Sequence, residues 1–208
     1  MTQLLFIRHG ETDWNRRQCF QGQLDVPLNG TGHAQAALMA GRLQADKPDA
    51  FYCSDLLRTR QTAAPLARAW GAEPVAMPGL REQAFGIFEG LDFPLIQAQH
   101  ADLWQRWVQQ DADFALPGGG ESMASFSARV LLALRHIVDR HAGQRVTIVT
   151  HGGVLDVLWR NAHGLPLQGG RTCEIPNTGL NRLLWREQRL KVVAWGDAAH
   201  LEQLEVVP

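Results

Sequence analysis

The sequence predicts an α/β fold: a three-layer α/β/α sandwich with a mostly parallel central sheet and a helical lid insertion. Short apolar runs typical of buried strands alternate with longer segments of helical periodicity, which favours a parallel sheet covered by helices on both faces. The chain has 208 residues, 45% of them hydrophobic and 20% charged, as in ordinary globular proteins. We expect one domain over residues 1–208, with a lid-like segment at about 83–120.

In the first half of the chain, strand-like and helix-like patterns alternate around one long polar segment. Apolar residues at helical spacing and a stop at Asp46-Lys47-Pro48 indicate the first helix. Pro65 interrupts the second helical pattern and predicts a kink or two segments. The segment 11–29, rich in Gln and Arg, is too long for a simple connector and is a candidate functional loop. The elements expected here are a strand at 4–7, a helix at 31–45, a strand at 49–53 and a helix at 56–70.

The second half of the chain continues the alternation. The run Leu116-Pro117-Gly118-Gly119-Gly120 predicts a hinge, and a strongly amphipathic helix follows it. Two final strand-like runs are joined by a short polar turn. The elements expected here are a strand at 75–77, a helix at 92–110, a helix at 122–141, a strand at 145–150, a helix ending at about 162, and strands at 180–185 and 190–195.

Composition argues against several classes of function. The net charge of −1 provides no global field for nucleic acid or an anionic membrane surface. No apolar run approaches the ~20 residues that span a bilayer, and the N-terminus lacks the pattern of a signal peptide. Cys19, Cys53 and Cys173 are scattered, without metal spacing, as reduced thiols in a cytosol would be. We expect a cytoplasmic protein that binds neither nucleic acid nor membrane. The composition leaves the oligomeric state open, with a homodimer as one option.

Two predicted strands end in a histidine followed by glycine. The first strand leads into Arg8-His9-Gly10 and the strand at 145–150 into His151-Gly152-Gly153. Ligands bind at the carboxyl ends of strands in open α/β sheets, so neighbouring strands would place both imidazoles at one pocket. A guanidinium beside an imidazole suits a phosphoryl group, which the imidazole could attack. Taken alone, the first triplet fits a surface turn with solvated side chains equally well.

Arg58 and Glu82 are the other candidates, each in a segment that follows a predicted strand. Phosphoryl transfer needs positioning and cations around the phosphoryl oxygens, and guanidiniums supply fixed paired donors. Nearby positive charge is expected to lower the pKa of His9, whose second ring nitrogen would donate to a backbone carbonyl. In isolation, Arg58 is more typical of a solvated residue in the first turn of a helix. Glu82 is also typical of a surface carboxylate, with Glu11 as its nearest rival for the acid.

Together and in this order, these residues resemble the histidine phosphatase superfamily, also called the phosphoglycerate-mutase-like family, over essentially the whole chain. The motifs that carry the resemblance are Arg8-His9-Gly10-Glu11-Thr12, Trp14-Asn15, the loop Gln21-Gly22-Gln23-Leu24-Asp25-Val26-Pro27-Leu28, Ser54-Asp55-Leu56 with Arg58, Gln61 and Thr62, and Thr150-His151-Gly152-Gly153.

The resemblance implies a role for each matching residue and no need for a metal or cofactor. His9 would be the nucleophile that forms a phosphohistidine, and Glu82 the general acid and later the general base. The remaining site residues fall into two groups: Arg8, Arg58 and His151 would bind the phosphoryl oxygens, and Asn15, Gln21, Gly22 and Gly152 would bind the substrate.

We therefore expect a phosphomonoesterase that hydrolyses a small phosphorylated metabolite through a phosphohistidine on His9. The segment 80–90 resembles the phosphatase branch, but Ile87-Phe88 departs from its aromatic spacing, so a cofactor-dependent phosphoglycerate mutase is the alternative. A non-catalytic phosphate-sensing or binding protein is a third option. A dinucleotide-binding protein is disfavoured, because the chain lacks the Gly-rich motif of that class after its first strand. Candidate substrates include sugar phosphates, phosphoglycerate derivatives, phosphoserine and ribazole phosphate, selected by residues 83–116 and the loop 18–28.

The remaining polar and aromatic residues are expected to be structural. Glu11 should accept hydrogen bonds from an arginine or from backbone donors. Trp104 and Trp107 should pack in the core, and the less favoured alternative is that one of them lines the substrate pocket. No histidine pair has metal-binding spacing. The residues expected to brace the pocket are Asp55, Arg60, Gln61 and Arg81, and those expected on surfaces or helix ends are His33, His100, His136, His141, His163 and His200.

Overall fold

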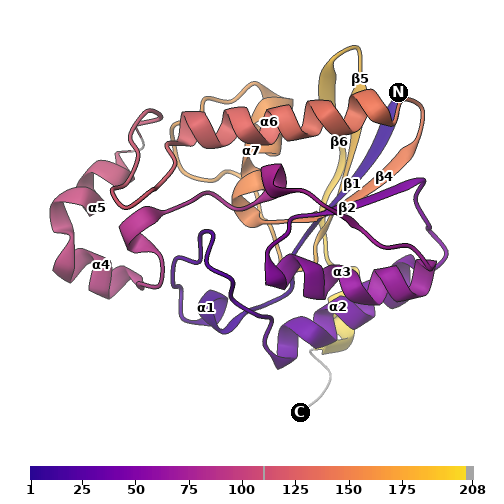
Figure 1. The fold of residues 1–208 in the computed structure, drawn as a ribbon, viewed down its shortest axis with the longest axis horizontal. Helices are drawn as coiled ribbons and strands as arrows, with labels where there is room; N and C mark the ends of the chain where they lie inside the picture. The colour runs from indigo at the N-terminus through magenta and orange to yellow at the C-terminus, as the bar shows by residue number, and fades with distance from the viewer. Residues whose placement is uncertain (110, 205–208) are drawn as a thin grey trace.

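A six-stranded sheet forms the centre of the computed structural model, which describes residues 1–109 and 111–204 (Figure 1). The strands lie in the order β3-β2-β4-β1-β5-β6; the first four are parallel, and β5 and β6 are antiparallel additions at one edge. The expected mostly parallel α/β sheet is confirmed. Its strands are β1 (Thr2–Arg8), β2 (Ala50–Cys53), β3 (Val75–Ala76), β4 (Arg145–Thr150), β5 (Leu180–Arg186) and β6 (Arg189–Asp197).

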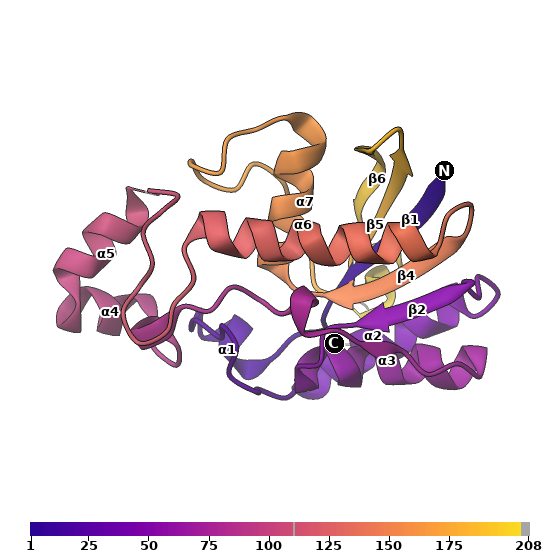
Figure 2. The ribbon, with the colours of Figure 1, turned by 45° about the horizontal axis from the view of Figure 1, so that its top comes forward.

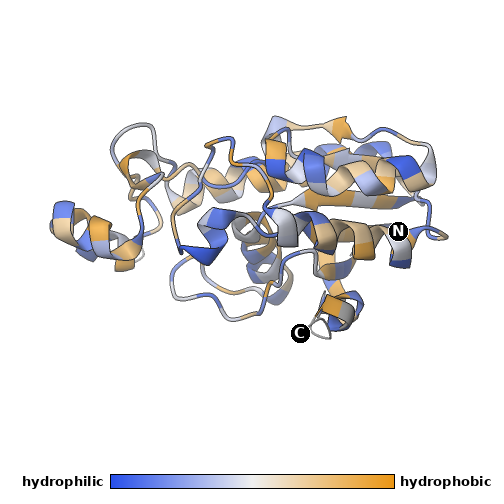
Figure 3. Cartoon of the chain, turned by 90° about the horizontal axis from the view of Figure 1, so that it is seen from below, coloured by the Kyte–Doolittle hydropathy of each residue, from blue (hydrophilic) through white to orange (hydrophobic). Residues whose placement is uncertain are grey.

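Helices cover both faces of the sheet, so the three layers are confirmed (Figure 2). Helices α2 (Gly30–Leu43) and α3 (Leu57–Trp70) lie on one face, and α6 (Met123–Arg140) and α7 (Gly152–His163) on the other. Strand β1 serves both cores because its side chains alternate: Leu4 and Phe6 pack toward α6 and α7, whereas Leu5 and Ile7 pack toward α2 and α3. A strand buried on both faces explains the continuous apolar run. Accordingly, the helices in Figure 3 carry hydrophobic and hydrophilic bands side by side.

Helix α3 corrects the expectation of a division at Pro65. The helix is continuous from Leu57 to Trp70 with the proline inside it. A proline in a helix interior costs about 3 kcal/mol. The side chains of Leu66 and Trp70, which follow the proline, are buried in the core, and each such burial stabilises by about 1.5–3 kcal/mol. Packing against the sheet therefore outweighs the missing hydrogen bond.

The segment expected as one helix at 92–110 is instead two helices, α4 (Phe93–Gln99) and α5 (Ala101–Val108). They separate at His100, whose backbone is not helical (φ −139°, ψ 42°). Both stand away from the sheet and pack around a small cluster of their own, centred on Phe88, Ile96 and Leu116 (Figure 1). A single helix of 19 residues would be about 28 Å long and could not wrap around so small a cluster.

Several short elements lie inside the predicted loops. The polar segment 11–29 contains α1 (Asp13–Arg16), which Thr12 and Asn15 cap reciprocally, each side chain accepting from the other's main-chain N–H. Three short 3₁₀ helices were not predicted: η1 (Pro78–Leu80), η2 (Gly86–Phe88) and η3 (Ala199–Leu204). Over the described ranges, no helix combines the length and apolar character needed to cross a membrane.

Candidate active site

His9 and His151 follow neighbouring parallel strands. Strands β1 and β4 pair with Arg8 opposite Thr150, and the His9 main-chain N–H donates to Thr150 O at 2.9 Å. The two imidazole ring centroids lie 5.3 Å apart, with their planes at 61°. The strand pairing therefore brings the two histidine motifs together, as the sequence predicted for neighbouring strands.

The His9 imidazole is held in one tautomer. Its Nδ1 lies 2.8 Å from Gly10 O, and because a carbonyl oxygen only accepts, Nδ1 carries the proton. This is the expected donation to a backbone carbonyl, and it leaves the lone pair on Nε2. Burial, followed by the charges of Arg58 and Arg8, holds the pKa of His9 well below its usual value. His9 thus presents a neutral nucleophilic nitrogen.

Arg8 ends β1 with its guanidinium beside His9. Its Nη1 donates to Ile175 O at 2.6 Å, while its buried Nε has no hydrogen-bond partner among the described residues. Burial is the main cause that lowers the pKa of Arg8 to about 10, with the charge of Arg171 second. The side chain remains a cation at neutral pH, and its Nε–H is available to a ligand.

Arg58, in the first turn of α3, is fully buried rather than solvated. Its Nη1 donates to Leu24 O at 2.9 Å and its Nη2 to Gly22 O at 2.7 Å, which fastens the loop at 21–24. Its Nε is buried without a partner in the described part of the chain. Thr62 joins the helix to the histidine motif, because its hydroxyl accepts from the Gly10 N–H and donates to Arg58 O.

Glu82 lies just after η1 and reaches the first turn of α7. Its Oε2 accepts from the Gly153 N–H at 3.0 Å and its Oε1 from its neighbour Gln83 N–H at 2.9 Å. A Cβ on Gly153 would overlap Glu82 Oε1, so a larger residue there would displace the carboxyl. Its rival Glu11 instead accepts from Asn29 Nδ2 at 2.8 Å, and its Oε1 lies 3.9 Å from Arg16 Nε, the structural role expected of it.

Most of the predicted site residues line one hollow of about 500 Å³, which we call the anion hollow. His151 and Gly152 lie behind its lining: His151 is fully buried, with Nε2 2.9 Å from Ser54 Oγ and Nδ1 unpartnered in the described chain. A Cβ on Gly152 would lie 3.6 Å from an Arg171 nitrogen and 3.7 Å from Arg8 Nε. The predicted residues that line the hollow are Arg8, His9, Asn15, Gln21, Gly22, Arg58 and Glu82.

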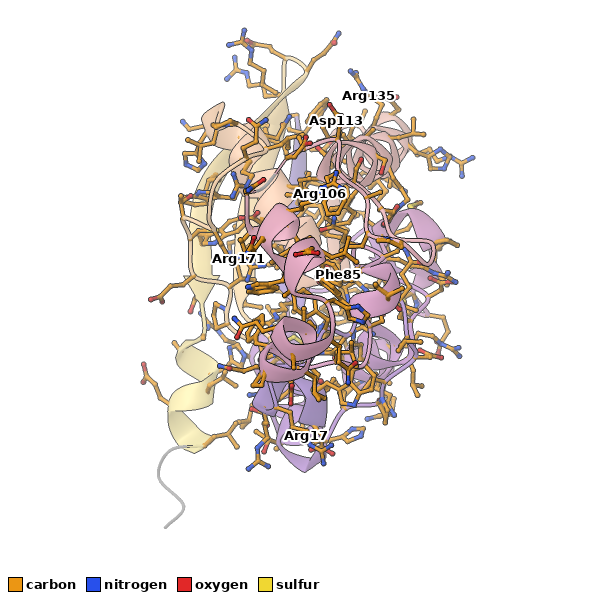
Figure 4. The ribbon with its side chains drawn as sticks, turned by 90° about the vertical axis from the view of Figure 1, so that its left-hand side faces the viewer. Arg17, Phe85, Arg106, Asp113, Arg135 and Arg171 are labelled. Carbon is orange, nitrogen blue, oxygen red and sulfur yellow. The ribbon has the colours of Figure 1, made fainter. Side chains whose placement is uncertain are left out.

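Arg171 is a cation of this site that the sequence analysis missed. It lines the anion hollow, and Figure 4, seen from the end of the molecule that carries α4 and α5, labels it together with Phe85, another lining residue. It stands in the segment between α7 and β5, directly after Gly169-Gly170. A basic residue after two glycines in a long irregular segment was the available signal, since such segments often carry binding residues.

The unpartnered N–H groups define what the hollow can bind. Arg8 Nε and Arg58 Nε belong to two buried cations, and leaving a buried donor unsatisfied costs about 1–3 kcal/mol. An anion with several acceptor oxygens would satisfy both beside His9 Nε2. A phosphoryl group has such oxygens, and the cationic donors make the hollow unsuitable for a metal ion.

Other predicted residues lie around the hollow or elsewhere. Arg81 pairs with Asp55 at 2.6 Å and Gln61 Oε1 accepts from the Leu28 N–H at 2.8 Å, so these three brace the site as expected. His200 is a correction: it is buried, with Nε2 3.0 Å from Thr178 Oγ1.

Trp104 and Trp107 are a second correction. They pack with the cluster centred on Phe88, Ile96 and Leu116 rather than in the sheet core, and both line a separate cavity beside the anion hollow. This was the lesser of the two alternatives. The indole rings stack on each other with centroids 5.5 Å apart.

Comparison with known proteins places relatives along the whole chain. The family model described as the histidine phosphatase superfamily (branch 1) matches residues 4–198. A metal-independent phosphoserine phosphatase from Arabidopsis thaliana is 32% identical over 98% of this chain and 85% of its own. A probable phosphoglycerate mutase GpmB from Yersinia enterocolitica is 33% identical over 97% of this chain and 96% of its own.

Solved structures agree with this fold. YhfR from Bacillus stearothermophilus superposes with a TM-score of 0.89 at 31% identity, covering 97% of this chain and 100% of that one. A mycobacterial glucosyl-3-phosphoglycerate phosphatase superposes with a TM-score of 0.81 at 29% identity, covering 94% and 98%.

Proposed function

The chain belongs to the histidine phosphatase superfamily, and on that premise we propose that it is a metal-independent phosphomonoesterase acting through a phosphohistidine on His9. The observation that carries the proposal is the state of His9: a buried imidazole with Nδ1 bound to Gly10 O and a free Nε2 in the anion hollow. The unpartnered Nε groups of Arg8 and Arg58 would hold the phosphoryl oxygens around it.

In the first step, His9 Nε2 attacks phosphorus as the bond to the ester oxygen breaks. Glu82 donates its proton to the departing alkoxide, and the alcohol leaves. The imidazole gains positive charge, which the Nδ1–H···O bond to Gly10 stabilises. In the second step, water attacks phosphorus, Glu82 takes the proton from water, and the N–P bond breaks. The net reaction converts ester and water to alcohol and phosphate, and both side chains return to their starting states.

Three further residues support the phosphoryl group in this proposal. His151 Nδ1 is buried next to the His9 ring, without a partner among the described residues. In the tautomer that carries its proton on Nδ1, it would donate to a phosphoryl oxygen. Gly152 begins α7, whose N-terminus favours negative charge. Asn15 Oδ1 is used in capping α1, which leaves its amide N–H groups for the hollow.

We further propose that the substrate is a small molecule and that the protein works in the cytoplasm as one domain. The net charge of −1 offers no general attraction for nucleic acid, so the cationic site must act locally. The three cysteines, Cys19, Cys53 and Cys173, are free thiols, as a reducing compartment would keep them.

Phosphoglycerate mutase activity is the second candidate, because relatives matched over nearly their whole length carry that name. The two activities differ in the fate of the phosphohistidine. A phosphatase admits water to it, whereas a mutase returns the phosphoryl group to another hydroxyl.

A panel of phosphomonoesters, including phosphoserine and 3-phosphoglycerate, tests the proposal by phosphate release at pH 6–7.5. We expect release from at least one ester, an acid-labile phosphoenzyme in the wild type, and neither in His9→Ala. Interconversion of phosphoglycerates without phosphate release would establish the mutase instead. Ligand binding without turnover in both proteins would establish a non-catalytic binding protein.

A further inference from the structure

A second cavity, of about 450 Å³, adjoins the anion hollow. We call it the aromatic cavity. The residues that line both spaces are Phe20, Glu82, Phe85, Phe93 and Arg171. An ester whose phosphoryl group lies at His9 therefore directs its alcohol past Glu82 into the aromatic cavity.

The aromatic cavity has the size and lining for a flat apolar group. Its volume lies within the 300–1,000 Å³ range of pockets for drug-sized ligands and far exceeds a three-carbon chain. Aromatic rings prefer stacked or edge-to-face contacts with other rings. The rings that line it are Phe20, Phe85, Phe93, Trp104, Trp107, Phe114 and Phe126.

Asp156 is the unusual polar group in this lining. Its side chain is 8% exposed, and its Oδ2 accepts from Arg160 Nε at 2.8 Å. Its Oδ1 is buried with no hydrogen-bond partner among the described residues; Arg171 Nε lies 3.9 Å away, too far for one. A buried acceptor without a donor costs about 1–3 kcal/mol, so a donor from a bound molecule would stabilise the site.

The position of Asp156 on α7 relates it to the acid of the reaction. Gly153, whose N–H holds Glu82, lies three residues before Asp156, so the two share one face of the helix with a rise of about 4.5 Å. Glu82 and Asp156 both line the aromatic cavity, so one bound alcohol can place its ester oxygen at Glu82 and a donor at Asp156.

We propose that the substrate is a phosphomonoester of an aromatic or similarly flat apolar alcohol bearing an O–H or N–H donor that Asp156 binds. Asp156 is then a specificity-determining residue of the site. This inference rests on the proposed phosphomonoesterase function. The competing explanation is that Asp156 serves only Arg160, whose guanidinium also donates to the carbonyl oxygens of Pro166, Gln168, Gly169 and Gly170.

Two aryl esters test the donor directly: 4-hydroxyphenyl phosphate and 4-methoxyphenyl phosphate. Their leaving groups are of similar basicity, but only the first carries a donor. We expect kcat/KM of the wild type to favour the hydroxyl ester by about ten- to a hundredfold, since hydrogen bonds to charged groups contribute about 1.5–3 kcal/mol. Both should exceed phosphoserine and 3-phosphoglycerate in kcat/KM. Equal values for the aryl pair, or faster turnover of the two small esters, would overturn the inference.

The variant Asp156→Asn tests whether the preference comes from a hydrogen bond to the Asp156 carboxylate or from the shape of the cavity, because asparagine has nearly the same shape. Its carbonyl oxygen can still accept from Arg160 Nε, while its amide presents donors to the cavity. The preference for the hydroxyl ester should fall to within about threefold. The matched control is Asp139→Asn, which removes an exposed carboxylate on α6 and should keep the preference.

A preference that survives in Asp156→Asn would assign Asp156 to Arg160 alone and reject the proposal. Should that variant not fold, the wild-type comparison decides by itself. Failure of the proposed function is distinguishable, because in that case no ester in the set releases phosphate.

Discussion

Glu82 and Gly153 form the contact that joins the acid to the second histidine motif. The Gly153 N–H donates to Glu82 Oε2 at 3.0 Å, two residues after His151. The carboxyl group, which comes from the segment after η1, is thereby held at the N-terminus of α7. This arrangement explains the glycine at 153, where a Cβ would overlap the carboxyl, whereas a Cβ on Gly152 would lie at ordinary contact distance from two guanidiniums.

Gly153→Ala is expected to impair proton donation in particular. Its Cβ would overlap Glu82 Oε1 and displace the carboxyl. General acid catalysis typically contributes 10²–10⁴-fold, so kcat/KM for alkyl phosphates should fall at least about a hundredfold. The good leaving group of 4-nitrophenyl phosphate needs less help and should lose much less. Gly41→Ala, on α2 with open space around it, is the control and should leave both rates unchanged. An equal loss for both esters would contradict the role of Glu82.

Arg58→Lys is expected to lower activity although it keeps the charge. Lysine donates from a single nitrogen and cannot reproduce the planar guanidinium, whose Nη1 and Nη2 bind Leu24 O and Gly22 O while Nε faces the phosphoryl group, so the loop and the phosphoryl contact are both weakened. We expect kcat/KM to fall by about 10²–10³-fold, as for other preorganised donors. Amide hydrogen exchange at residues 22–24 should speed up. Arg60→Lys, exposed two residues later, provides the comparison; a similar loss there would reject the assignment.

Buried neutral histidines should make stability fall in mild acid. Burial together with Arg58 holds the pKa of both His9 and His151 well below 6.5, whereas in the unfolded chain they titrate near 6.5. Below pH 6.5 the unfolded state therefore binds protons that the folded state does not. The free energy of unfolding should decrease by up to about 1.4 kcal/mol per pH unit for each histidine until the folded pKa is reached.

Urea unfolding at pH 7.5, 6.5 and 5.5 measures this dependence. His151→Gln and His9→Gln should each remove a similar part of the slope between pH 6.5 and 5.5. The part that remains should come from His200, whose pKa burial also lowers. An unchanged slope in both variants would show that other groups control the acid response.

The sequence predicted the parts of the site that local patterns carry. An apolar run ending in Arg8-His9-Gly10, and another ending in Thr150-His151, specify two buried strands and the polar residues at their ends. Motif order added Arg58 and Glu82. The parts that long-range contacts place were not predictable in this way: Arg171 depends on a loop held by Arg160, and the division at His100 depends on the small cluster around Ile96.

Arg160→Met should be the most destabilising single change outside the anion hollow. The Arg160 guanidinium is buried, pairs with Asp156 Oδ2 and donates to four carbonyl oxygens of residues 166–170. Its removal leaves the buried Asp156 carboxylate without its hydrogen-bonded cation and with only Arg171 Nε 3.9 Å from Oδ1. Breaking a buried ion pair typically costs about 3–5 kcal/mol.

The double variant Asp156→Leu/Arg160→Met tests this cause. Replacing both charges removes the uncompensated carboxylate, so the double variant should recover part of the stability that Arg160→Met loses in urea unfolding. Its activity should remain low, because the carbonyl oxygens of residues 166–170 still lack their donor and Arg171 is no longer positioned at the anion hollow. If the double variant recovered full activity together with stability, the loop at 166–170 would not be needed to position Arg171 at the anion hollow.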